Sequence, residues 1–167
     1  ALEIIFQLGA SHSIENQNND DRDVINAVLK AIARLGDVEM IRPFVLQQLD
    51  SDNAGARLLA VSVLNHPLAS AQNPDYSDQT LKRIFALADD PAVRVRLKLI
   101  ELLARLAKNG KPSVPTLIQL YENDENLKVR QAAFSNLASM DSDHAPSVMP
   151  LVLAGVSSPD GEIRADA

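Results

Sequence analysis

The stretch Asp89-Asp-Pro-Ala-Val-Arg94-Val-Arg-Leu97 recurs in altered form three more times along the 167 residues of the chain. Each copy has an acidic or turn-forming start, a small or β-branched residue, an arginine and an apolar continuation. The other copies start at Asp52, Glu125 and Ser158. The arginines of the four copies follow one another at nearly regular intervals, at Arg57, Arg94, Arg130 and Arg164. Self-similarity at a fixed period of about 20 to 50 residues predicts a repeat protein.

Each copy of the repeat is expected to contain two helices. Upstream of each arginine, apolar residues recur with helical periodicity, and this predicts first helices over residues 38–49, 79–88, 113–121 and 145–156. The second helices follow Asp, Asn or Pro turns and are predicted over residues 53–64, 91–108, 126–140 and from 160 onward. Only 4% of the residues are aromatic and none is Trp, so the core must consist mainly of aliphatic side chains.

Prolines give further signals for where helices begin. Pro43, Pro115 and Pro150 stand at nearly the same distance before the arginine of their repeat, where a proline either starts or kinks the first helix. The pair Asp90-Pro91 predicts a second helix that starts at Pro91, with the Asp90 side chain as its N-cap.

The helix pairs are expected to form one all-α domain over residues 1–167, an α-solenoid of about four antiparallel pairs. The approximate bounds of the repeats are 1–36, 37–65, 78–108, 112–140 and 145–167, the last incomplete. Two polar, turn-rich segments, 10–19 and 65–78, are predicted loops, and the second is either an insertion or a binding loop. Because a helix pair cannot bury its apolar face alone, the sequence is expected to be a piece of a longer solenoid.

These features resemble the HEAT-repeat family, and the resemblance extends from about residue 20 to the end. Its marks are the prolines of the first helices, the acidic turns at Asp52, Asp89 and Glu125, and the residue pairs Ala56-Arg57, Val93-Arg94, Val129-Arg130 and Ile163-Arg164. Asp23, Thr80 and Ser158 depart from the pattern. The resemblance implies stacked helix pairs in a right-handed superhelix, with the second helices lining a concave face.

The composition and the missing motifs disfavour enzymatic activity and several classes of partner. The net charge of -6 and pI near 5.0 disfavour nucleic acids and anionic membranes as partners. The uncharged run of residues 145–159 is too short, and too interrupted by prolines, to insert into a membrane. None of the three histidines precedes a glutamate, as they do in the di-iron hydroxylases built from related repeats. Phosphate-loop, nucleophile-elbow and His-Glu-x-x-His motifs are absent from the sequence. We therefore expect no catalytic residues, no metal site and no cofactor.

The sharpest charge asymmetry lies between Pro91 and Ser113, which includes six basic residues and one acid, Glu101. Four of the basic residues share one helical stripe with Glu101: Arg94, Lys98, Arg105 and Lys108. A positive ridge of this kind suits an acidic or phosphorylated peptide, and the alternative is an ordinary solvated face. The repeated Arg57, Arg94 and Arg130 are expected mainly to pair with acids of the turns, as a ladder that fixes the repeat register.

The sequence as a whole favours a non-catalytic scaffold that binds a partner along the concave face. The partner is another protein or another domain of the same polypeptide, and an acidic segment fits the ridge best. The candidate binding residues are Arg94, Lys98, Arg105 and Lys108, with Arg57, Arg130 and Gln131 as neighbours. Two alternatives stay open: a structural spacer or accessory module of a larger enzyme or complex, and a bilin-lyase-like protein, since short HEAT-like repeats also resemble that group.

Overall fold

The computed structural model of the chain describes residues 4, 7, 26, 27, 30, 31, 38–66, 76–140 and 142–166. The predicted first repeat, residues 1–36, lies almost wholly outside the described residues. The predicted loop 10–19 lies outside them altogether, as does most of the loop 65–78.

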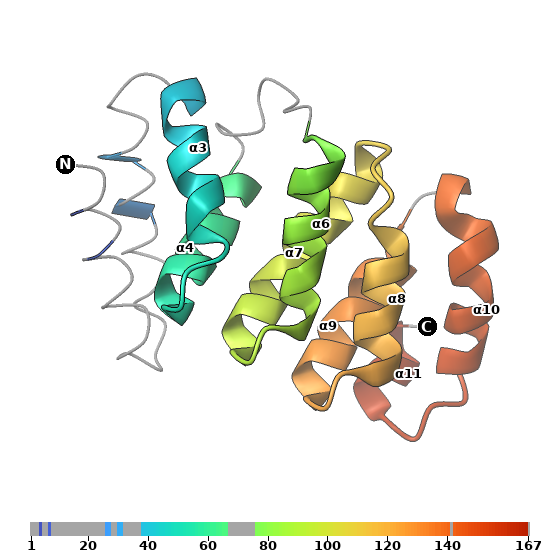
Figure 1. The fold of residues 1–167 in the computed structure, drawn as a ribbon. Helices are drawn as coiled ribbons and strands as arrows, with labels where there is room; N and C mark the ends of the chain where they lie inside the picture. Colours follow the sequence, from blue (N-terminus) through green and yellow to red (C-terminus); the bar gives the residue numbers. More distant parts are fainter. Residues whose placement is uncertain are drawn as a thin grey trace. The chain divides into compact units, whose positions relative to one another are not determined.

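Helices make up all the regular structure of the described part, which contains no strand (Figure 1). This confirms the all-α fold, and the predicted helices agree with the observed ones to within two residues at their described ends. In chain order the elements are α3 Val38–Gln48, α4 Ala54–Asn65, α6 Asp78–Ala86, the 3-10 helix η1 Leu87–Asp89, α7 Val93–Lys108, α8 Val114–Asn123, α9 Leu127–Ala138, the 3-10 helix η2 Ser142–His144, α10 Ala145–Gly155 and α11 Gly161–Asp166.

The chain divides into two compact units, Ala1–Leu87 and Ala88–Ala167. In the first unit, α3 packs against α4. Val45 of α3 and Leu49, in the turn directly after α3, are buried together with Leu59 of α4. Arg83 of α6 ties this helix to the end of α3, because its Nη2 donates to the Leu46 carbonyl and to the Asp50 carboxylate, both at 2.6 Å.

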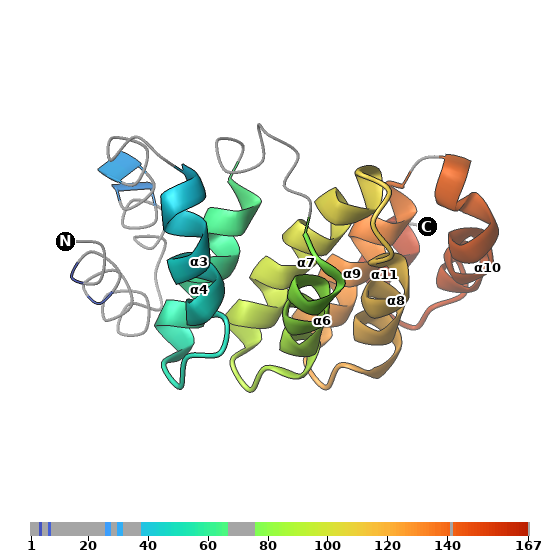
Figure 2. The same cartoon turned by 45° about the horizontal axis from the view of Figure 1, so that its top comes forward.

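The second unit is organised around α9, which contacts α7, α8, α10 and α11. Here α8 and α10 lie on one side, and α7, α9 and α11 form the other layer (Figures 1 and 2). Phe134 of α9 is fully buried, and its ring centroid is 5.1 Å from that of Tyr121 on α8. The remaining core is aliphatic, as the composition predicted, with Leu99, Leu103, Leu117 and Leu137 all buried.

A serine and a glycine fix the connection from α7 to α8. Gly110 has φ 71° after the C-cap Asn109, and the N–H of Lys111 donates to the Leu106 carbonyl at 2.9 Å, as in a Schellman motif. The buried Ser113 then donates its hydroxyl to the Leu103 carbonyl at 2.8 Å. The start of α8 is thereby anchored to the middle of α7.

The three recurrent prolines do not play one role. Pro115 lies in the first turn of α8, where it starts the helix, whereas Pro43 and Pro150 lie inside α3 and α10. The expectation for Pro91 is wrong, because α7 begins at Val93 with Ala92 as its N-cap. Asp90 instead accepts the N–H of Ala92 at 2.8 Å, so it shapes the turn before the helix.

Candidate interface on the second helices

One arginine per repeat binds the turn that precedes its own helix. In each of four turns a guanidinium Nη1 donates to the carbonyl oxygen six residues earlier, at 2.6 to 2.7 Å. The donor and acceptor residues are Arg57 and Ser51, Arg96 and Asp90, Arg130 and Asp124, and Arg164 and Ser158. The side chain of each acceptor residue also accepts the backbone N–H two residues later. The repeat signature therefore closes a turn with a long arginine side chain.

This geometry corrects the sequence register of the second copy, in which Arg94 was predicted to be the repeated arginine. Arg96 occupies that position, and its turn residue is Asp90 rather than Asp89. In the corrected register the interval from Arg96 to Arg130 equals the interval from Arg130 to Arg164. The interval from Arg57 to Arg96 is longer because more residues connect α4 to α6 than connect the later helix pairs.

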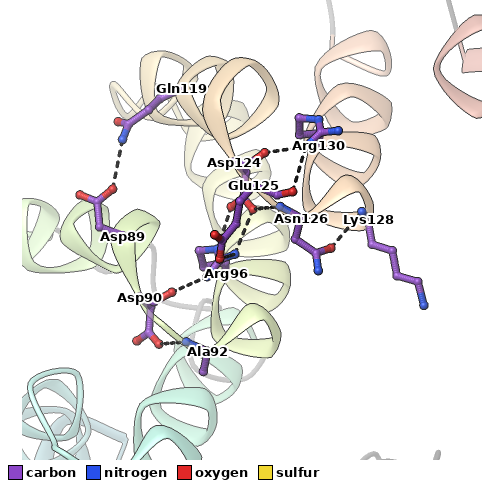
Figure 3. A network of polar contacts seen from close by, with 10 residues as sticks. All are labelled: Asp89, Asp90, Ala92, Arg96, Gln119, Asp124, Glu125, Asn126, Lys128 and Arg130. Atoms are coloured by element: carbon purple, nitrogen blue, oxygen red, sulfur yellow. Dashed lines mark hydrogen bonds and ion pairs between the residues drawn. The ribbon is translucent and has the colours of Figure 1, made fainter. Parts of the chain in front are cut away.

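Arg96 also joins its repeat to the next one (Figure 3). Its Nε and Nη2 donate to the two carboxylate oxygens of Asp124, at 2.7 and 2.9 Å. Only 6% of the Arg96 side chain and 3% of the Asp124 side chain are exposed. The hydrogen bond to Asp124 is the main cause that raises the pKa of the Arg96 guanidinium, and the charges of Asp124, Glu125 and Asp90 raise it further against the effect of burial. Arg96 therefore stays charged inside the protein.

The described bonds of the repeated arginines differ from the predicted ion-pair ladder. The described bonds of Arg130 go to the backbone carbonyls of Asp124 and Glu125, and Arg57 donates to the carbonyl of Ser51. The buried ion pair between repeats is made by Arg96, which the sequence reading left out of the ladder. Because these contacts are internal, Arg57 and Arg130 have a structural task whether or not they contact a partner.

The predicted basic stripe lies along α7, and its four members differ in accessibility. Arg94 and Lys108, near the two ends of the helix, are exposed, whereas Lys98 and Arg105 are half-buried. The Lys98 ammonium is also paired with Glu101 at 2.6 Å. By exposure, Arg94 and Lys108 are the most accessible cations of the stripe, about 21 Å apart along the helix at 1.5 Å per residue.

One further basic residue joins this surface. Lys128 follows Arg94 by the same interval that separates Arg130 from Arg96, so it occupies the same register on the adjacent helix α9. Its side chain is exposed and points away from the polar network (Figure 3). Lys128 is not among the binding residues predicted from the sequence, which include Gln131, but the corrected register identifies it. Gln131 donates to both carboxylate oxygens of Asp160 at 3.1 Å, which links α9 to the turn before α11.

Within the described residues, His, Asp and Glu side chains form no group that would hold a metal ion, and none of the described helices is both long and apolar enough to cross a membrane.

Stacked helix pairs joined by short turns, each closed by the same arginine contact, define a helical-repeat protein. A family model described as HEAT repeats matches residues 42–138 and 81–167. Together these matches cover well over half of the sequence, and the chain belongs to the HEAT-repeat family. A comparison with curated proteins finds no match. HEAT repeats are generally protein-interaction modules and are typically non-catalytic.

Proposed function

We propose that this protein is an interaction module whose second helices α7 and α9 bind an acidic segment of a partner. The observation that carries the proposal is the exposed basic surface formed by Arg94, Lys108 and Lys128, together with the half-buried Lys98 and Arg105. A positive surface on a chain of net charge -6 is a local exception that favours a negatively charged partner.

The dimensions of this basic surface indicate the form of the partner. About 21 Å separates the register of Arg94 from that of Lys108, a distance that an extended segment spans with about seven residues. Lys128 lies on the neighbouring helix, about one interhelical spacing of 8–10 Å from the register of Arg94. A short acidic stretch along α7, with one further acid toward α9, would meet each exposed cation.

The test is the affinity for a fluorescent oligoglutamate peptide about seven residues long, measured by anisotropy at low and high salt. The double variant Arg94→Glu and Lys108→Glu is preferred over changes at Arg105, because both residues are exposed and their replacement leaves the core intact. We expect this variant to bind at least about tenfold more weakly. The matched control is the double variant Lys30→Glu and Lys82→Glu, which reverses two exposed lysines outside the basic surface and should bind normally.

Two outcomes would contradict the proposal. Equal binding by the wild type and the double variant would show that the basic stripe is an ordinary solvated face. Equal loss of binding in the control with Lys30→Glu and Lys82→Glu would show that only the total charge matters. Either result would favour the alternative role of a structural spacer within a larger assembly.

A further inference from the structure

Helix α10 and its C-cap residue expose three large apolar side chains on one face. Met149, Leu153 and Val156 are 50%, 65% and 56% exposed, and their spacing of four and three residues places them along one stripe. The helix carries no charged residue. Contiguous exposed apolar side chains of this kind mark an interaction surface more often than a free one.

Stacking of repeats does not account for this face. The repeat register that relates Arg130 to Arg96 also relates Met149, Leu153 and Val156 to Pro115, Gln119 and Glu122 of α8. These three residues of α8 are exposed even though α10 and α11 follow them in the same unit. This face of α8 is therefore open to solvent even though another repeat follows it. On α8 the face carries two polar side chains, whereas on α10 all three are apolar.

Leu153 also replaces a polar link between neighbouring first helices. In the first unit Arg83 of α6 donates to Asp50, and in the second unit Gln119 of α8 donates to Asp89 at 3.4 Å. Both acceptors directly precede a turn closed by the repeated arginine. Leu153 has the register of Gln119, and Asn123 has the register of Asp89. Because a leucine side chain has no donor, Leu153 makes no such hydrogen bond to Asn123. The apolar face of α10 thus takes the place of a stabilising contact.

The charged residues near this face indicate which kind of partner it binds. Neither α8 nor α10 contains Lys or Arg. Two exposed carboxylates lie near the stripe in repeat register or in the sequence: Glu122 has the register of Val156, and Asp143 stands six residues before Met149. A second copy of the chain would bring like charges together, and one short helix offers far less than the about 800 Å² per partner of a standard interface. An anionic membrane would be repelled for the same electrostatic reason.

We infer that the Met149, Leu153 and Val156 face of α10 docks a basic amphipathic helix of a partner protein. Apolar side chains of that helix, repeated at intervals of three and four residues, pack on the stripe. Its Lys or Arg residues on the flanks meet Glu122 and Asp143. This surface lies on a first helix and is chemically opposite to the basic surface of α7 and α9, so the protein has two contact sites of different selectivity.

The test uses the full chain and three fluorescent peptides of equal length: an amphipathic Leu/Lys helix, the same helix with Glu in place of Lys, and a scrambled Leu/Lys sequence. The variants are Leu153→Gln, which introduces the residue that α8 carries at that register, and Val156→Gln, which removes an apolar side chain without adding a charge. The matched control is Leu127→Gln, which removes an exposed leucine, 44% accessible, from α9. Circular dichroism and thermal unfolding check that the fold is kept.

The expected result is tightest binding of the amphipathic Leu/Lys helix. A loss of about tenfold or more is expected in Leu153→Gln, because the variant no longer buries a leucine side chain on binding. The Leu127→Gln control should bind normally, and Leu153→Gln should unfold no earlier than the wild type. Equal binding of all three peptides, unchanged affinity in both variants, concentration-dependent dimerisation abolished by Leu153→Gln, or preferential binding of phosphatidylcholine vesicles would each overturn the inference.

Discussion

Replacing Arg96 with methionine tests the contact that joins two repeats of the second unit. The change removes three hydrogen bonds of 2.6 to 2.9 Å, two to the Asp124 carboxylate and one to the Asp90 carbonyl. It also leaves the Asp124 side chain, only 3% exposed, without its buried counter-charge. Methionine has similar length and is apolar, so the cavity term stays small and the result reports mainly on the lost polar contacts.

The magnitude follows from burial. Removing one partner of a buried, hydrogen-bonded ion pair costs about 3–5 kcal/mol, whereas a pair exposed to solvent contributes about 0–1 kcal/mol. The Arg96 and Asp124 pair belongs to the first class because both side chains are nearly inaccessible. At about 2–4 °C per kcal/mol for a chain of this size, the unfolding midpoint should fall by about 6–20 °C.

The assay is urea unfolding followed by circular dichroism, with a thermal scan of the same samples. Lys98→Met is the control, because it removes a partly exposed ion pair on the same helix and should cost at most about 1 kcal/mol. Combining Arg96→Met with Asp124→Leu should cost less than the sum of the two single changes. If Arg96→Met unfolds within about 1 kcal/mol of the wild type, the reasoning that this pair holds the repeats together is refuted.

Three further predictions concern local structure and pH. Gly110→Ala should destabilise by about 1–2 kcal/mol in urea unfolding, because Gly110 has φ 71° while no atom would touch an added Cβ, and an unchanged midpoint would disprove the left-handed cap. Asn126→Ala should cost about 1 kcal/mol of unfolding free energy, because the Asn126 side chain, as the N-cap of α9, accepts the N–H of Lys128 at 3.0 Å. The control is Ser135→Ala, at an exposed position of the same helix. Equal stability of the two variants would contradict the cap. A raised pKa in the folded state gives stability that is present below the unfolded pKa and lost only as the pH rises through the folded one. Arginine in the unfolded chain already stays protonated far above neutral pH, and the pKa of Arg96 is raised further in the folded chain. The free-energy difference between the wild type and Arg96→Met should therefore show no decline from arginine deprotonation between neutral pH and about pH 10. A difference that vanishes well below pH 10 would show that another group controls the pair.

Much of the fold was predictable because each helix pair repeats the same physical pattern. Helical periodicity, turn residues and the arginine of each repeat predicted every helix from α3 to α11 that the structure describes, since those signals are local to a single repeat. The register of the second copy failed because Arg94 and Arg96 both follow Asp-rich turns, and sequence alone does not show which side chain folds back to its carbonyl. The start of α7 was predicted at Pro91 for a related reason. The sequence does not show that the Asp90 side chain binds the N–H of Ala92 in the turn instead of capping the helix.

The candidate interface was predictable only in part. The basic stripe of α7 follows from spacing, yet the spacing could not show that Lys98 pairs with Glu101 or that Arg105 is half-buried. Lys128 was missed because its equivalence to Arg94 depends on the corrected register. The apolar face of α10 was hidden for a different reason: a leucine in an apolar helix is normally assigned to the core, and only its exposure in the folded chain shows otherwise.

The central claim, that an acidic partner binds on the second helices of the second unit, is tested most directly by amide and side-chain NMR shift mapping during titration with the oligoglutamate peptide. The account predicts shifts concentrated on residues 94–108 of α7 and on Lys128 at the start of α9, with salt weakening them in step with affinity. Shifts confined to α10, or spread evenly over the exposed lysines and arginines of both units, would contradict it.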